Sequence, residues 1–183
     1  MLRALWLGVS LLSIGHVLPT QAIDGAMVSY GQGMNDTLIQ HEDISGANYL
    51  ALGLFWDSGY SFENDNLGYG EVEIETYFAQ VQDQQTLNIV AVRPVINFWD
   101  SAEKKRPWYW QFGVGLSYFD RQQIGPVTLS SNGQFATIFG VGLALDSAQK
   151  HRLTLRYNHY SNGYLKKPNP GLDTFSLDWH IRF

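Results

Sequence analysis

Large apolar side chains alternate with small or polar ones along most of the chain after residue 23. In the segment 46–58 the apolar side chains stand at every second position, namely Leu50, Leu52, Leu54 and Trp56. An alternation with period two places successive side chains on opposite faces of a β-strand. Eight segments share this pattern, close to residues 26–33, 46–58, 70–78, 88–98, 107–119, 134–146, 151–161 and 172–183. The pattern therefore predicts an all-β protein with eight strands.

The two faces of these segments predict a membrane environment. One face is rich in Val, Leu, Phe and Trp, while the opposite face carries glycines and polar side chains. The segments are about 8–13 residues long, and a tilted membrane strand needs about 9–11. A soluble barrel would enclose its large apolar side chains, whereas an eight-stranded membrane barrel turns them toward lipid around a narrow polar interior. We therefore predict an eight-stranded antiparallel transmembrane β-barrel of the outer-membrane type.

Charged side chains also occur at inward positions of the predicted strands. They are Glu71, Glu73, Glu75, Arg93, Arg152 and Arg156. Because buried charges need partners, we expect them to form a paired network with a structural role. Pro94 lacks a backbone N–H, which predicts a bulge in its strand.

The two ends of the chain predict its location. Arg3 precedes an apolar run that ends near Leu18, and small residues at Thr20 and Ala22 offer a cleavage site, as in a secretory signal peptide. The alternative is a membrane anchor, but the run is shorter than the roughly 20 residues that a spanning helix needs. We expect a signal peptide at residues 1–22 and one barrel domain at 23–183. The C-terminal Phe183 is similar to the assembly signal of outer-membrane barrels and predicts the bacterial outer membrane.

Composition argues against several classes of function. The net charge of −5 gives no reason to expect a nucleic-acid partner. The chain has no cysteine, which excludes disulfides, thiolate nucleophiles and Cys-ligated metals. The histidines show no metal-ligand spacing, so we expect neither a metal site nor a cofactor.

The last predicted hairpin holds three side chains that can build a nucleophilic site. Strand parity turns His159, Ser161 and Asp173 outward and places them at the loop end of adjacent strands. An ionisable group that faces lipid is costly, and it indicates a functional site. The plainer alternative is a polar rim at headgroup level, because His-x-Ser alone is a weak signal.

A longer motif makes the signal more specific. The stretch "HYSNGYLKKPNPGLDTFSL" resembles the active-site segment of the outer-membrane lipid A 3-O-deacylases, the PagL family, whose pattern is His-x-Ser-Asn, Lys-x-Pro-Asn-x-Gly and then an acidic residue. The resemblance implies an eight-stranded outer-membrane barrel that hydrolyses the ester-linked hydroxyacyl chain at position 3 of lipid A. The acidic residue of the family is typically Glu, whereas this chain has Asp173.

The resemblance implies a role for each matched residue. Ser161 would be the nucleophile, His159 the general base and acid, and Asp173 the group that orients the histidine. Asn162 would help form the oxyanion hole. Four further residues are expected to contact substrate: Tyr157 and Phe175 along an acyl groove, and Lys166 and Lys167 at lipid A phosphates.

Two alternative functions remain open from the sequence. The chain could be a non-catalytic barrel that stabilises the membrane or binds a partner, or an esterase or phospholipase with another lipid substrate. Lipid A, as part of lipopolysaccharide, is the expected substrate, and a homodimer is left open because a site on the lipid face can be shaped by a barrel–barrel contact.

Overall fold

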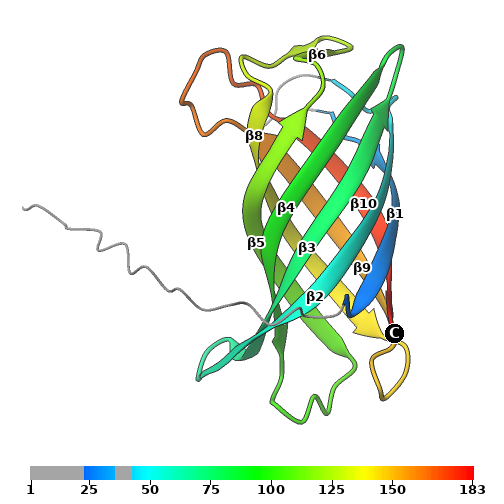
Figure 1. Ribbon diagram of the computed structural model, residues 1–183, viewed down its shortest axis with the longest axis vertical. Helices are drawn as coiled ribbons and strands as arrows, with labels where there is room; N and C mark the ends of the chain where they lie inside the picture. Colours follow the sequence, from blue (N-terminus) through cyan, green and yellow to red (C-terminus); the bar gives the residue numbers. More distant parts are fainter. Residues whose placement is uncertain (1–22, 36–42) are drawn as a thin grey trace, which may run out of the picture.

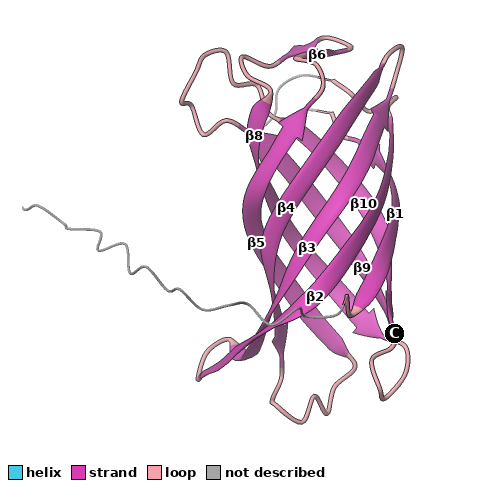
Figure 2. Ribbon diagram, viewed as in Figure 1, coloured by secondary structure: helices cyan, strands magenta, loops and turns pink. Residues whose placement is uncertain are grey.

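The computed structural model describes residues 23–35 and 43–183, so the predicted signal peptide lies outside the described residues. Eight long strands close into a tilted barrel, and two short strands form a separate two-stranded sheet beyond one end (Figures 1 and 2). The strands are β1 Gly25–Gly33, β2 Asn48–Asn64, β3 Gly68–Gln82, β4 Thr86–Trp99, β5 Trp108–Phe119, β6 Gln123–Ile124, β7 Val127–Thr128, β8 Gly133–Ala144, β9 His151–Ser161 and β10 Leu172–Arg182. Within the described ranges, no helix is long and apolar enough to cross a membrane.

The eight barrel strands pair antiparallel in chain order, and the barrel closes where the first strand pairs with the last. Its order is β1-β10-β9-β8-β5-β4-β3-β2, and β1 pairs with β10 from Gly25↔Arg182 to Gly33↔Thr174. The predicted fold is therefore confirmed. We call the end with β6, β7 and the 162–171 connection the loop end, and the end with the C-terminus the turn end (Figure 1).

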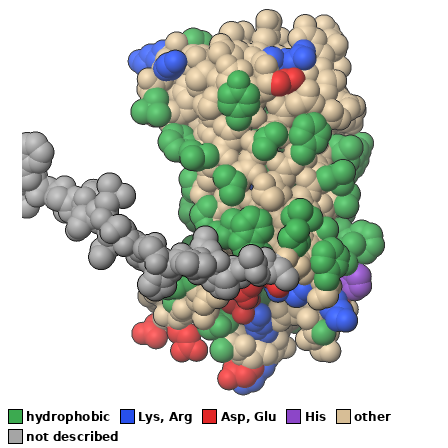
Figure 3. All heavy atoms as spheres, in the orientation of Figure 1, with side chains coloured by type: hydrophobic (Ala, Val, Ile, Leu, Met, Phe, Trp, Pro, Cys, Tyr) green, Lys and Arg blue, Asp and Glu red, His purple; other side chains and the backbone are tan. Residues whose placement is uncertain are grey.

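The outer surface of the barrel is apolar, as the alternation predicts. Leu52 is 57% exposed, whereas its neighbour Ala51 is 1% exposed. Figure 3 shows hydrophobic side chains gathered around the middle of the barrel, with charged side chains at its two ends. An outward apolar band between polar ends fits a bilayer.

Buried ion pairs fill the interior of the barrel. Arg156 Nη2 lies 2.6 Å from Glu75 Oε1, and its Nη1 lies 3.0 Å from Asp178 Oδ2. Arg93 Nη2 contacts the same glutamate at 2.9 Å, and Arg152 Nη2 binds Glu73 at 2.9 Å. The predicted paired network is confirmed for five residues, namely Glu73, Glu75, Arg93, Arg152 and Arg156, and Asp178 is a further member that was not predicted.

Glu71 pairs with a lysine outside the predicted network. Its carboxylate lies 2.6 Å from Lys104 Nζ, with side chains 23% and 18% exposed. Lys104 belongs to the connection after β4 at the turn end. Glu71 is therefore part of the mouth of the barrel rather than of its buried network.

An apolar cluster closes the lumen at the loop end. Ile124, Val127 and Leu129 of the β6–β7 segment are buried together with Tyr160 and Leu172. Tyr160 and Leu172 face each other across β9 and β10. The inner face of the last hairpin is therefore packed against the loop that covers the barrel.

The predicted bulge at Pro94 is wrong. The β3–β4 register runs through Ile74↔Pro94 without a shift, and the β4–β5 pairs on both sides, Val92↔Leu116 and Val95↔Gly113, stay in step. The missing N–H of proline is accommodated by omitting two pairs toward β5, with no extra residue inserted. The register shift lies instead in β2, between Asp57 and Ser61.

Glu75 is the shared acceptor of the interior network, so its replacement tests the network. Glu75→Ala leaves Arg93 and Arg156 buried without that carboxylate, and breaking a buried pair typically costs about 3–5 kcal/mol. We expect a large loss of stability for the detergent-refolded barrel, measured by urea unfolding. Glu103→Ala is the control, because its side chain is 67% exposed and 4.0 Å from Lys105, and it should leave stability almost unchanged. Equal stability of the two variants would contradict a structural role for the network.

Candidate active site

His159 and Asp173 form a direct pair at the loop end of the last hairpin. The β9–β10 register sets Asp173 opposite His159, and Oδ1 of the carboxylate lies 2.5 Å from Nδ1 of the imidazole. The aspartate is 0% exposed and the histidine 9% exposed. The shorter acidic side chain therefore reaches the imidazole, and Nε2 remains the ring nitrogen directed away from this bond.

Tyr157 contacts the other oxygen of the same carboxylate. Its hydroxyl donates to Asp173 Oδ2 at 2.6 Å. Tyr157 lies two residues before His159 on the same face of β9, and it is half-buried. The sequence predicted this side chain only as a wall of an acyl groove, and its hydroxyl contact with the acidic residue was not anticipated.

Ser161 follows His159 by two residues, which places both side chains on one face of β9. It pairs with Phe135 of β8 and is half-buried. Among the described residues, its hydroxyl has no hydrogen bond to His159. Catalytic hydrogen bonds are often long in substrate-free enzymes and tighten in the complex with substrate.

Asn162 is fixed in the loop that follows Ser161. Its Nδ2 donates to Ser130 Oγ at 2.7 Å and to the Lys166 carbonyl at 3.1 Å, while its backbone N–H donates to Asn169 Oδ1 at 2.9 Å. Both amide protons are thus engaged within the loops. For the predicted oxyanion role, one of these bonds has to be exchanged for substrate.

Two of these loop contacts were not predicted. Asn169 belongs to the matched motif, so the sequence marked it as a residue of interest. The motif does not indicate its contact with the backbone N–H of Asn162. Ser130 comes from the distant β7–β8 connection, and no local pattern points to it. It links the site to the loop that closes the lumen.

Gly171 makes room for the imidazole. A Cβ at this position would lie 3.0 Å from His159 Cε1, and the glycine has a φ of 79°. Both the close approach and the left-handed backbone favour glycine. This explains why the motif carries Gly two residues before Asp173.

An apolar cavity of about 330 Å³ adjoins the site. It is lined by Leu116, Ser117, Ser131, Gly133, Gln134, Phe135, Asn162, Leu165 and Lys166. Of the residues predicted to contact substrate, Lys166 lines this cavity. Phe175 lies across from Tyr157 on the outer face and is 43% exposed. Lys167 is exposed in the loop.

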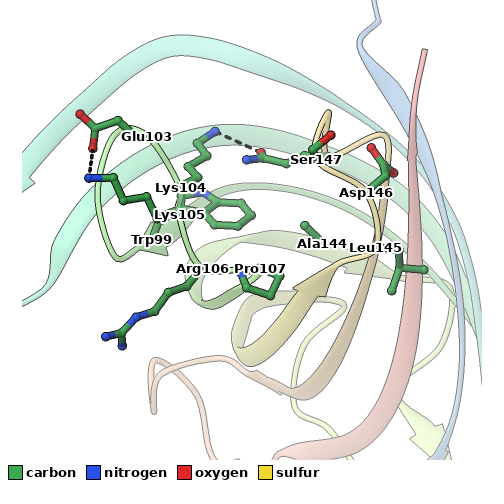
Figure 4. A pocket seen from close by; sticks show the side chains of 11 residues that line it. Trp99, Glu103, Lys104, Lys105, Arg106, Pro107, Ala144, Leu145, Asp146 and Ser147 are labelled. Atoms are coloured by element: carbon green, nitrogen blue, oxygen red, sulfur yellow. Dashed lines mark hydrogen bonds and ion pairs between the residues drawn. The ribbon is translucent and has the colours of Figure 1, made fainter.

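A second cavity, of about 410 Å³, lies at the turn end (Figure 4). Its Lys104 Nζ is held by Glu71 at 2.6 Å and by Gln149 Oε1 at 3.1 Å. Backbone N–H groups of Lys150 and His151 donate to Asp146 and lower the pKa of this carboxyl below its usual value. The contact of Lys104 with Gln149 joins the two turns, and none of the predicted site residues lines this cavity.

Within residues 23–35 and 43–183, no group of three or more His, Asp or Glu side chains is arranged to hold a metal ion. The chemistry that the loop-end geometry supports is instead that of a serine nucleophile beside an acid–histidine pair.

Comparisons with known proteins find similar sequences. The family model described as lipid A 3-O-deacylase (PagL) matches residues 48–182, which include the whole hairpin. A lipid A deacylase PagL of Pseudomonas aeruginosa is 28% identical over 176 residues, or 93% of this chain and 92% of that protein. One of Bordetella bronchiseptica is 31% identical over 90 residues, or 49% of this chain and 47% of that protein.

A solved structure supports the fold. The crystal structure of the outer membrane enzyme PagL aligns with a TM-score of 0.71 and 22% identity, covering 87% of this chain and 99% of that one. The family model covers most of the barrel and all the residues of the acid–histidine–serine cluster. The chain therefore belongs to the lipid A 3-O-deacylase (PagL) family.

Proposed function

We propose that this outer-membrane enzyme hydrolyses the 3-O-linked acyl ester of lipid A with Ser161 as nucleophile, His159 as base and acid, and Asp173 as the orienting carboxylate. The observation that carries the proposal is the 2.5 Å contact between His159 Nδ1 and Asp173 Oδ1 on the lipid-facing side of the barrel. Membership of the deacylase family supports the ester-hydrolase class and the lipid A substrate.

The mechanism follows from the order of these side chains. His159 Nε2 accepts the proton of Ser161 as Oγ attacks the ester carbonyl, and then donates it to the leaving sugar oxygen. Asp173 holds the Nδ1–H tautomer and stabilises the imidazolium that forms. Water then hydrolyses the acyl-enzyme by the same proton transfers, which releases the fatty acid and restores Ser161.

Asn162 would supply a donor to the oxyanion in this scheme. Its Nδ2 bond to the Lys166 carbonyl is 3.1 Å, longer than its 2.7 Å bond to Ser130. Exchange of the longer bond for substrate leaves the amide anchored by Ser130. Removal of one such donor typically lowers kcat about 10²–10³-fold.

The outward position of the cluster suits a substrate that is itself a membrane lipid. The ester lies near the boundary between headgroups and acyl chains, so a cluster at the end of the apolar band can meet it without extraction of the lipid. The apolar cavity beside Asn162 and Lys166 offers space for an acyl chain. All the proposed catalytic residues come from one chain, so the proposed chemistry requires no second copy.

Ser161→Ala tests the nucleophile. The refolded wild-type barrel should reduce the mass of lipid A by one hydroxyacyl chain in mass spectrometry, and the Ser161→Ala variant should leave the lipid mass unchanged because no acyl-enzyme can form.

Ser147→Ala at the turn end is the matched control, since this serine is exposed and far along the barrel from the hairpin. It should retain full activity. Deacylation by the Ser161→Ala variant would overturn the assignment of the nucleophile. If the folded wild-type barrel releases acyl chains from phospholipids but not from lipid A, the proposal that lipid A is the substrate is contradicted.

Lys166 and Lys167 are expected to bind lipid A phosphates, because both are exposed cations beside the site. Changing both to Gln should raise KM several-fold with little change in kcat, and it should weaken the salt dependence of KM. Kinetics in mixed micelles at two salt concentrations measures both effects. Lys105→Gln at the turn end is the control, and a KM equal to that of the control would contradict phosphate binding by the loop.

A further inference from the structure

We propose that Tyr157 is a positioning residue that fixes the Asp173 carboxylate for the acid–histidine–serine chemistry, an inference that rests on the proposed function. Its phenol hydroxyl donates to Oδ2 at 2.6 Å, while Oδ1 contacts His159 Nδ1 at 2.5 Å. Both oxygens of the carboxylate are therefore engaged. Rotation about the Cβ–Cγ bond would break both contacts at once.

Strand geometry explains why a tyrosine can make this contact. Tyr157 stands opposite Phe175 and Asp173 stands opposite His159, so Tyr157 and Asp173 are diagonal neighbours on one face of the hairpin. Diagonal positions lie about 7–8 Å apart between Cα atoms, within reach of a long aromatic side chain. The half-buried ring covers a carboxylate that is itself 0% exposed.

The lipid-facing location makes this donor important. A carboxylate on the outer surface of a barrel has little water to satisfy its oxygens, and buried charges are stable only when they are paired and hydrogen-bonded. A hydrogen bond to an ionised acceptor is roughly twice as strong as a neutral one. The hydroxyl of Tyr157 supplies such a bond to the oxygen that faces away from the histidine.

Asp173 gains from this support because it is short. An aspartate has one methylene fewer than a glutamate with which to reach the imidazole. In this chain the opposed register brings the carboxylate to His159, and the tyrosine sets its rotation. Tyr157 thereby acts through Asp173 and His159, without contact with the reacting atoms.

The competing role for Tyr157 is that of a groove wall for the acyl chain. The two roles depend on different parts of the side chain, because a wall needs the ring and positioning needs the hydroxyl. Tyr157→Phe removes the hydroxyl alone. Tyr30→Phe is the matched control, since this tyrosine is 60% exposed on β1 and donates its hydroxyl to Asn48 Oδ1 at 3.3 Å.

The first measurement is the rate of acyl release from lipid A by the refolded, full-length mature barrel. Tyr157→Phe should lower kcat about tenfold or more, as expected for a lost hydrogen bond to a charged group, with KM changed less than about twofold. Tyr30→Phe should leave both constants unchanged. Wild-type kcat in the Tyr157→Phe variant, or a change confined to KM, would overturn the positioning role.

The second measurement does not depend on turnover. The proton shared by His159 Nδ1 and Asp173 should give a strongly downfield NMR resonance in the micelle-embedded barrel, absent from the Asp173→Asn variant. Tyr157→Phe should shift or broaden this resonance, and Tyr30→Phe should not. An unchanged resonance in Tyr157→Phe would overturn the inference, even if the wild type is active. A changed resonance in a barrel without deacylase activity would keep the positioning contact and refute the proposed function.

Discussion

The narrow interior of an eight-stranded barrel governs the rest of this structure. Large apolar side chains do not fit inside in number, so they face lipid, and the interior is left to small and polar groups. Charges placed there have to neutralise one another, as Glu75 does with Arg93 and Arg156. The result is a core of ion pairs that joins β3, β4, β9 and β10, and the last two of these strands carry the loop-end residues.

The two faces of β9 have different roles, since the inner face packs in the barrel and the outer face carries candidate catalytic residues. Tyr160 points inward and packs in the cluster that closes the loop end, whereas His159 and Ser161 share the outer face. Because adjacent residues on a strand are locked to opposite faces, packing of Tyr160 also fixes the backbone that carries its two neighbours. Ser130 adds a link from the closing loop to Asn162 at 2.7 Å.

Local alternation was sufficient to predict the fold because it reports directly which face of a strand meets lipid. Strand number and closure were confirmed, and so were the interior ion pairs of Glu73 and Glu75. The predicted bulge at Pro94 was wrong because a strand can accommodate a missing N–H donor by leaving out residue pairs with its neighbour, as β4 does toward β5. The prediction for Glu71 was wrong because strand alternation gives no information about residues of the turns, and its partner Lys104 lies on a turn.

The candidate site was predictable only in part, because alternation gives the face on which a side chain lies but not its contacts. His159, Ser161 and Asp173 lie within one hairpin, so parity and register bring them to one face from sequence alone. The support around them depends on side-chain directions that no local pattern encodes. Tyr157 had the correct face but could equally point along the lipid surface, and the hydrogen bond to Asp173 decides between the two. A polar cluster on a lipid-facing surface is stable only when hydrogen bonds satisfy its polar atoms. The residues that supply these bonds are therefore best sought on the same face, at diagonal positions of the neighbouring strand.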